Sequence, residues 1–260
     1  MTITSKITEA QKIEAANADP TLSPYYVSVL YADFGKRKTT TAVSMVKERG
    51  LLLSTDDSWK VLRNPSFKPL LDKVRIIKLE GLTQFQYINL EFDDRTGQPY
   101  DTIIWDTASK TIDRYLDLLS TNADWGGKYR DVINSTHAEL KGATSLGFPD
   151  YKFTRDQARP VLDKLFNETK AHIVITSQMT KPIPGMGKNQ QERPRMPEAT
   201  FAIIGERADI IGQLIPGNRG KFLIDVSDNS LTLLGKSRIE TIQGRMDLDT
   251  FVANYKEFVF

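Results

Sequence analysis

Short apolar runs alternate along the chain with segments whose apolar residues recur at helical spacing. The apolar runs predict strands at residues 26–31, 51–54, 74–79, 102–105 and 172–176. The helical patterns fall at residues 39–49, 109–120 and 154–169. Strands and helices that alternate in this way predict an α/β fold, in which helices flank a mainly parallel sheet with right-handed crossovers.

The last third of the chain departs from this alternation. Residues 222–226 and 230–234 are short apolar runs separated by polar turn residues, and they predict a C-terminal β-hairpin. Residues 179–200 show no periodicity and contain four prolines, which predicts a long loop. Long loops in compact domains are typically functional or disordered, so this segment is a candidate binding element.

The beginning of the chain is a separate element. Residues 5–17 have an amphipathic helical pattern that ends before Pro20. We therefore divide the chain into an N-terminal arm, residues 1–25, and a single domain, residues 26–260.

Composition narrows the classes of protein that this chain can belong to. A chain of 260 residues with 40% hydrophobic residues is long enough to bury one substantial core. It has no cysteine, which excludes disulfides, thiol nucleophiles and cysteine metal sites. No secretion signal and no run near the ~20 apolar residues of a membrane helix is present, so we expect a cytoplasmic protein without membrane contact. A net charge of +2 requires that any nucleic-acid binding come from a local basic cluster.

The turn after the first predicted strand carries the strongest candidate chemistry. An apolar strand, a short polar loop and a helix start form the context of a Walker A phosphate loop. Its two terminal glycine positions hold Ala32 and Arg37 instead, and Gly35 remains inside the loop. Because Arg37 has a Cβ and a long side chain, we expect that side chain to point away from the phosphates. The alternative is a basic strand-to-helix turn that binds no ligand.

This loop predicts a site for ATP and Mg²⁺. Lys38 is expected to neutralise charge between the β and γ phosphates, and the Thr39 hydroxyl to bind Mg²⁺. The residues expected to contact the nucleotide are Gly35, Lys36, Arg37, Lys38, Thr39 and Thr40.

A second motif supports the metal site. The apolar strand at 102–105 ends in Asp106, as a Walker B strand does when it delivers one carboxylate to Mg²⁺. A buried strand that ends in Asp at a turn is also common for structural reasons. The position of Asp106 after the phosphate loop favours the metal role.

The strand at 172–176 completes the pattern, because it ends in the polar residues Thr176, Ser177 and Gln178. With these three motifs, residues 26–239 resemble the RecA, RadA, DnaB and KaiC class of P-loop ATPases in order and spacing. The chain is especially similar to small phage-encoded RecA-like ATPases of single-strand annealing and recombination. The resemblance implies that this strand lies between the two Walker strands. It also implies that Gln178, or else Ser177, senses the γ-phosphate; an ordinary polar strand end is the alternative.

The resemblance also implies a catalytic acid and an interfacial pair of cations. Asp56, with Asp57 as the second choice, follows the strand at which the class carries its acid; helix capping is the alternative reading. The class more often has Glu there, so the shorter Asp implies slow turnover. Lys236 and Arg238 resemble the Lys-x-Arg motif that RadA-like and KaiC-like subunits insert into a neighbour's site. This implies a homo-oligomeric ring or filament with interfacial nucleotide sites, against the alternative of a solvated strand end.

Two basic segments are candidates for DNA binding. In the RecA class the segment after the strand at 172–176 binds DNA, and its cations suit a sequence-tolerant contact with single strands. The second segment pairs cations with aromatic residues at positions 125–130. The candidates are Lys181, Lys188, Arg193 and Arg195 in the first segment, and Lys128 and Arg130 in the second. A plain solvated loop is the alternative for both.

Together these features predict a RecA-like ATPase that couples ATP and Mg²⁺ binding to single-stranded DNA binding in recombination or annealing. The resemblance implies that it is phage-encoded and works in the host cytoplasm. A first alternative is a nucleotide-binding assembly protein that has lost hydrolysis, which Ala32 and Arg37 suggest. A second is a small-molecule kinase with a phosphate loop.

Overall fold

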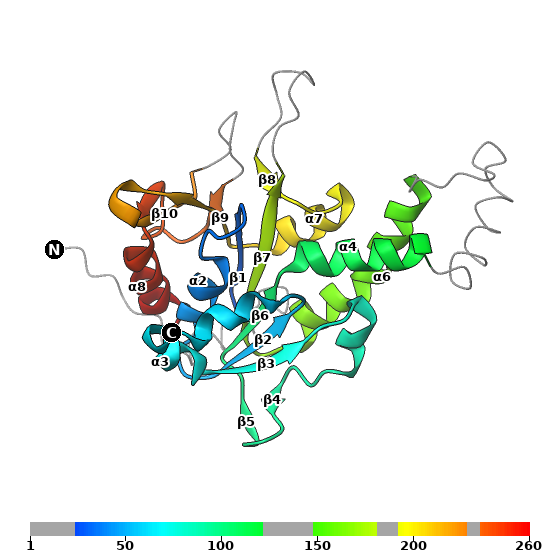
Figure 1. The fold of residues 1–260 in the computed structure, drawn as a ribbon, viewed down its shortest axis with the longest axis horizontal. Coiled ribbons are helices and arrows are strands. Elements are labelled where there is room, and N and C mark those ends of the chain that lie inside the picture. Colours follow the sequence, from blue (N-terminus) through cyan, green and yellow to red (C-terminus); the bar gives the residue numbers. More distant parts are fainter. Residues whose placement is uncertain (1–23, 122–147, 181–191, 228–234) are drawn as a thin grey trace, which may run out of the picture.

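The computed structural model describes residues 24–121, 148–180, 192–227 and 235–260, and its centre is one mixed β-sheet (Figure 1). Within these residues the sheet has ten strands, in the order β12-β10-β9-β1-β7-β6-β2-β3, with β11 paired to β9 and β8 paired to β7. Most of the predicted arm, residues 1–23, lies outside the described residues.

The middle of the sheet is parallel. Its strands are β9 (Ile210–Pro216), β1 (Val27–Ala32), β7 (His172–Thr180), β6 (Thr102–Asp106), β2 (Gly50–Ser54) and β3 (Val74–Lys78). All five strands predicted for this region are present and begin within one residue of the expected position. β7 lies between β1 and β6, as expected, so their carboxyl ends meet at one edge of the sheet.

Antiparallel strands extend this core at its margins. They are β8 (Arg193–Pro194) on β7, β11 (Lys236–Ser237) on β9, β10 (Phe222–Asp225) on β9, and β12 (Arg245–Asp247) on β10. A separate two-stranded sheet joins β4 (Phe92–Asp93) to β5 (Gln98–Pro99). β10 forms at the first strand of the predicted hairpin, but its neighbours in the sheet are β9 and β12. The predicted second strand lies in residues 228–234, outside the described part of the chain.

Helices cover both faces of the sheet (Figure 1). One face packs against α4 (Ala108–Thr121), α6 (Phe148–Asp163) with its π-helical end (Lys164–Glu168), and α7 (Glu198–Arg207). The other face packs against α2 (Lys38–Ser44), α3 (Lys68–Leu71) and α8 (Leu248–Val259). Short 3₁₀ helices are η1 (Asp57–Arg63), η2 (Pro65–Phe67), η3 (Leu82–Tyr87) and η6 (Asn218–Gly220).

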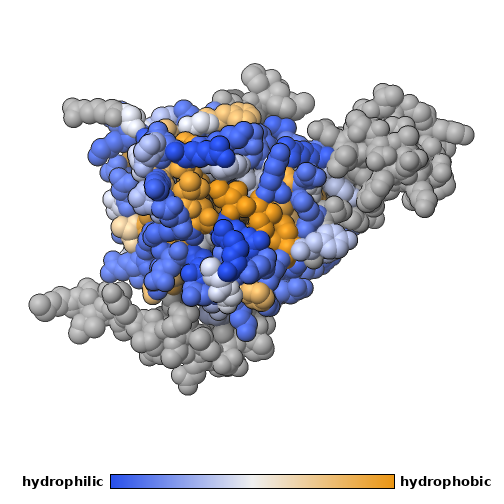
Figure 2. Space-filling model, turned by 60° about the horizontal axis from the view of Figure 1, so that its bottom comes forward, coloured by the Kyte–Doolittle hydropathy of each residue, from blue (hydrophilic) through white to orange (hydrophobic). Residues whose placement is uncertain are grey.

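Side-chain alternation along the strands places apolar residues on both faces at once. In β1, Val29 and Tyr31 belong to one core cluster, whereas Leu30 and Ala32 belong to the other. A parallel strand that is buried on both faces needs apolar residues at every position, which is why these strands were visible as continuous apolar runs. Seen from below, the described surface is largely hydrophilic and is crossed by an apolar strip (Figure 2).

Three of the predicted boundaries differ from those in the structure. The helix after the phosphate loop ends at Ser44, because the Asp101 carboxylate accepts hydrogen bonds from the backbone N–H groups of residues 47–49. The predicted loop at 179–200 is shorter at both ends, since β7 runs to Thr180, where it pairs with β8, and α7 begins at Glu198.

Within the described ranges, no helix is long and apolar enough to cross a membrane.

Candidate nucleotide-binding site

The loop between β1 and α2 folds as a tight turn. Its backbone is left-handed at Gly35, with φ 70°, and at Arg37, with φ 57°. Glycine adopts this region freely, whereas a Cβ makes it costly. The Arg37 carbonyl accepts hydrogen bonds from the Thr41 backbone N–H at 2.9 Å and from the Thr40 and Thr41 hydroxyls at 2.9 and 2.8 Å. These bonds fix the backbone of Arg37, at a position that glycine occupies in the Walker A pattern. The guanidinium of Arg37 lies 4.8 Å from the ring centroid of Phe222.

Lys38 is buried inside this turn. Its ammonium donates hydrogen bonds to the carbonyl oxygens of Ala32 at 3.0 Å and Asp33 at 2.8 Å. Burial lowers the pKa of Lys38 below its ordinary value, although the charges of Asp106 and Asp33 oppose the shift. A bound phosphate would replace these neutral carbonyl partners with negatively charged oxygens.

Asp106, at the carboxyl end of β6, gathers hydroxyl groups from three other elements. One oxygen, Oδ2, accepts hydrogen bonds from Thr39 Oγ1 at 2.8 Å and Ser58 Oγ at 2.6 Å. The other, Oδ1, accepts from Thr176 Oγ1 at 2.5 Å. Carboxylate and hydroxyl oxygens are the donors that Mg²⁺ prefers, so Thr39 and Asp106 fit this ion together with nucleotide phosphates.

Asp56 lies between β2 and η1, directly before the first residue of η1. Its Oδ1 accepts a hydrogen bond from the Ser58 backbone N–H at 2.8 Å, so it caps this 3₁₀ helix. Its Oδ2 lies 2.7 Å from Lys110 Nζ. Burial raises the pKa of Asp56, but the hydrogen bonds from Lys110 and Ser58 outweigh this and hold the pKa below its ordinary value. Asp57 is exposed and pairs with Lys60 at 2.6 Å.

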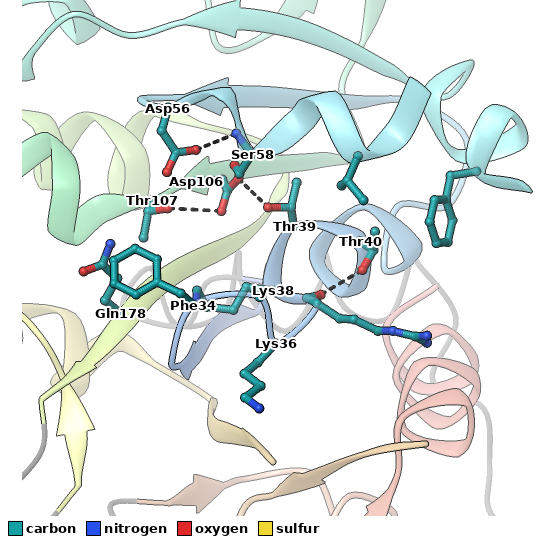
Figure 3. Close-up of a pocket in the computed structure, with 14 residues that line it drawn as sticks. Phe34, Lys36, Lys38, Thr39, Thr40, Asp56, Ser58, Asp106, Thr107 and Gln178 are labelled. Carbon is teal, nitrogen blue, oxygen red and sulfur yellow. Dashed lines mark hydrogen bonds between the residues drawn. The ribbon is translucent and has the colours of Figure 1, made fainter. Parts of the chain in front are cut away.

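These groups surround one cavity of about 490 Å³, in which Asp106, Thr39 and Ser58 face one another (Figure 3). All six residues that were expected to contact ATP line this cavity, together with Asp56, Asp106 and Gln178. Its wall also includes residues that the sequence did not single out: Phe34, Ser58, Val61, Phe67 and Thr107. Phe34, exposed inside the loop, was visible in the sequence; the others reach the cavity through the fold.

Gln178 connects the cavity to the strand that follows. It pairs with Ala32 across β7 and β1, and its backbone N–H donates to Ser109 Oγ at 3.0 Å. Its side-chain Oε1 accepts a hydrogen bond from Arg195 Nη1 at 3.2 Å, and its carbonyl accepts one from the Arg195 backbone N–H at 2.7 Å. Arg195 Nη2 also lies 3.1 Å from Asp113 Oδ2 of α4. Arg195 therefore joins three elements beside the cavity.

Lys236 and Arg238 do not reach this cavity within their own chain. Lys236 Nζ donates to the Gly205 carbonyl at 3.0 Å, and Arg238 Nη1 lies 3.1 Å from Asp209 Oδ1. Lys236 pairs with Ile211 near the beginning of β9, which in turn pairs with the beginning of β1. Both cations therefore lie at the amino end of the parallel strands, opposite the phosphate loop, and a role across an interface stays a prediction.

The predicted DNA contacts are described in part. Arg193 lies on β8, 3.8 Å from the Glu198 carboxylate, and Arg195 is engaged as above. The remaining candidates lie outside the described residues: Lys128, Arg130, Lys181 and Lys188.

Comparison with known protein families gives a match over most of the chain. Residues 25–239 match the model of a family described as AAA domain. The chain belongs to this family. Among solved structures, the crystal structure of the RadB recombinase is similar at 9% sequence identity, over 78% of this chain and 80% of that chain, with a TM-score of 0.39. No curated protein sequence matches the chain.

Family membership and sheet order together confirm that this AAA domain protein has a RecA-like P-loop ATPase core. The mostly parallel sheet flanked by helices is the predicted fold class. A core of this kind indicates nucleotide binding. Phage origin stays a prediction.

Proposed function

We propose that this protein binds ATP with Mg²⁺ in the cavity beside the phosphate loop and hydrolyses it. The observation that carries the proposal is the contact between Thr39 and Asp106 at 2.8 Å, next to the buried ammonium of Lys38. A cation for phosphate and two oxygen ligands for Mg²⁺ thus converge from α2 and β6, which is the arrangement that nucleotide hydrolysis requires.

Each group has a distinct role in this proposal. The Lys38 ammonium exchanges the carbonyls of Ala32 and Asp33 for phosphate oxygens, and its pKa rises as it does so. Thr39 and Asp106 would hold Mg²⁺, which neutralises charge on the β and γ phosphates. Asp56 lines the cavity and orients the attacking water through its carboxylate. Because Lys110 lowers the pKa of Asp56, this carboxylate is a weak proton acceptor, and slow turnover follows.

We further propose that the nucleotide state controls binding of single-stranded DNA. The segment that carries Lys181 and Lys188 leaves from β7 and returns through β8. Gln178, on β7, lines the nucleotide cavity, and Arg195, just after β8, hydrogen bonds to it. A shift of the Gln178 side chain toward a terminal phosphate would therefore be transmitted to Arg195, which hydrogen bonds to its Oε1. Arg195 is engaged beside the cavity and its side chain is half exposed, so we propose that it takes part in this coupling and, with Lys181, Lys188 and Arg193, in the DNA contact.

The test is ATP binding and hydrolysis by the full chain, with and without single-stranded DNA. Lys38→Ala is expected to lose ATP binding, while Lys68→Ala, at an exposed lysine outside the cavity, binds as the wild type does. Wild-type turnover is expected to rise when single-stranded DNA is added. Unchanged ATP affinity in a folded Lys38→Ala protein would refute the nucleotide site, and turnover that ignores DNA would refute the coupling.

A second candidate function is an ATP-binding assembly protein that does not hydrolyse. Two observations favour it: Arg37 stands in a left-handed position of the phosphate loop, and Asp56 is paired with Lys110. Single-turnover measurement separates the two functions, because tight ATP binding without phosphate release supports the second. In either case we propose that Lys236 and Arg238 act at a neighbour's site in a ring or filament.

A further inference from the structure

A second cavity, of about 620 Å³, lies at the opposite edge of the sheet from the nucleotide-binding site. Its lining includes residues 47–49, which follow α2, Asp101, which precedes β6, and His172, which begins β7. In the nucleotide-binding site, by contrast, Asp106 lies at the carboxyl end of β6, and Gln178 lies on β7 beyond its middle. Because these strands are parallel, the two cavities are at different ends of the sheet, and the proposed ATPase chemistry makes no use of the second one.

Three cations without carboxylate partners line this second cavity: Lys47, Arg49 and Lys170. In the described part of the chain none of them forms an ion pair. Lys47 Nζ lies 5.2 Å from the ring centroid of Phe260, and Arg49 Nη1 donates a hydrogen bond to the Gln98 side chain. Their positive charge is therefore available to an anionic ligand.

The carboxylates that line the cavity are fewer than its cations. One of them is Asp101, whose two oxygens accept hydrogen bonds from the backbone N–H groups of residues 47–49, at 2.6 to 3.3 Å. Glu48 is exposed on the rim. Two further cations, Lys73 and Lys256, lie close by. Lys73 Nζ donates a hydrogen bond to the Lys47 carbonyl at 2.7 Å. The pKa of Lys256 is lowered, first by its burial and second by the positive charge of Lys73. The balance of charge around the cavity is positive.

Aromatic rings form another part of the wall. The ring centroids of Phe260 and His172 are 4.9 Å apart, and those of Tyr25 and His172 are 5.6 Å apart, both edge to face. Tyr25, His172 and Phe260 all line the cavity. Aromatic rings beside cations are the combination that binds nucleotides along a single strand, since a base stacks on a ring while its phosphate contacts a cation. The cavity also falls within the size range of small-ligand sites, roughly 300–1,000 Å³.

We propose that this second cavity binds a nucleotide unit, with its phosphate against Lys47, Arg49 and Lys170 and its base against the ring of Tyr25 or Phe260. Two sources supply that chemistry, a free nucleoside monophosphate and one residue of a single-stranded nucleic acid. The site is independent of the phosphate loop and of residues 181–195, so it goes beyond the proposed function.

The test uses two probes on the full chain: a fluorescein-labelled oligothymidylate of about 15 nucleotides, followed by anisotropy, and thymidine monophosphate, followed by calorimetry. The pocket variant replaces three cavity cations: Lys47→Gln, Arg49→Gln and Lys170→Gln. The control variant removes the same charge at three exposed lysines outside the cavity: Lys68→Gln, Lys78→Gln and Lys221→Gln. Thermal melting of each variant shows that it is folded.

If a single strand is the ligand, the pocket variant binds the oligonucleotide about tenfold more weakly than the control variant does. The slope of log affinity against log salt also falls by roughly 0.7, because the cavity contacts one phosphate of the strand. Phe260→Leu, which keeps an apolar side chain, weakens binding several-fold and leaves the slope unchanged, since it removes a stacking surface and no charge.

If free nucleotides are the ligand, only thymidine monophosphate binding shows this difference between the two variants. Equal binding by the pocket and control variants for both probes would overturn the proposal. A wild-type protein that binds neither probe would also overturn it. Replacing Lys181, Lys188 and Arg193 provides the comparison with the proposed DNA segment. Loss of binding in that variant alone supports the proposed DNA segment and overturns this second site. Loss of binding in the pocket variant alone supports the second site and overturns the proposed DNA segment.

Discussion

Replacing Arg37 by glycine is expected to leave a more stable protein than replacing it by alanine. Both changes remove the guanidinium and its contact with the Phe222 ring, worth about 0.5–1 kcal/mol at an exposed site. They differ in the Cβ, which at φ 57° costs roughly 1–2 kcal/mol. The greater freedom of glycine in the unfolded chain offsets about 0.4–1 kcal/mol of this. Arg37→Gly should therefore be about 1 kcal/mol more stable than Arg37→Ala.

Urea unfolding followed by circular dichroism measures this difference, provided that the two variants share one m-value. An ordinary helical position gives the opposite order, because alanine there is favoured over glycine by about 1 kcal/mol. An Arg37→Ala protein as stable as Arg37→Gly would therefore show that this residue is not left-handed. ATP affinity in the same two proteins adds a second check. We expect Arg37→Gly to bind at least as tightly as Arg37→Ala, because a loop without a Cβ lets phosphate approach the backbone more closely.

Three further predictions address the metal site, acid stability and assembly. Asp106→Asn should weaken ATP binding more in the presence of Mg²⁺ than in EDTA, and equal losses would assign Asp106 a structural role. The hydrogen bond from Arg95 lowers the pKa of Asp93 to about 2 in the folded protein. The ionised Asp93 therefore stabilises the fold fully at pH values above its pKa in the unfolded chain, and this stabilisation is lost as pH falls through its pKa in the folded protein. Asp93→Asn should thus cost roughly 1 kcal/mol near neutral pH, after allowance for solvent screening, and progressively less between about pH 4 and pH 2; a pH-independent loss in urea unfolding would contradict this. Mixing Arg238→Ala with Lys38→Ala chains should restore ATPase activity if Arg238 acts across an interface, and no recovery in demonstrably mixed assemblies would remove that role.

Much of the fold was predictable because its signals are local. The parallel strands are buried on both faces and therefore appear as continuous apolar runs. A helix beginning within a few residues of the first strand, with Lys38 and Thr39 at its start, marked the phosphate loop. β9 and α8 were missed, although residues 210–216 are largely apolar, because no motif drew attention to them.

The candidate site was predictable only as far as its motifs extend. Lys38, Thr39 and Gln178 each follow or end a recognisable strand, and all three line the cavity. Ser58 and Thr176 were not assigned to Asp106, because their hydroxyls reach its carboxylate across distances of 48 and 70 residues along the chain. No local pattern carries information about such contacts.

The sequence by itself determined which segments form the core and which turn is the candidate phosphate site, since hydrophobic period and turn composition act over a few residues. Tertiary structure alone decided the partners of the charged groups. It paired Asp56 with Lys110, which lowers the basicity of the candidate catalytic acid, and it placed Arg195, a predicted DNA contact, against the side chain of Gln178. Charge and hydrogen-bond partners depend on which strand ends meet at one edge of the sheet. That arrangement arises from strand order, which is a property of the whole folded chain.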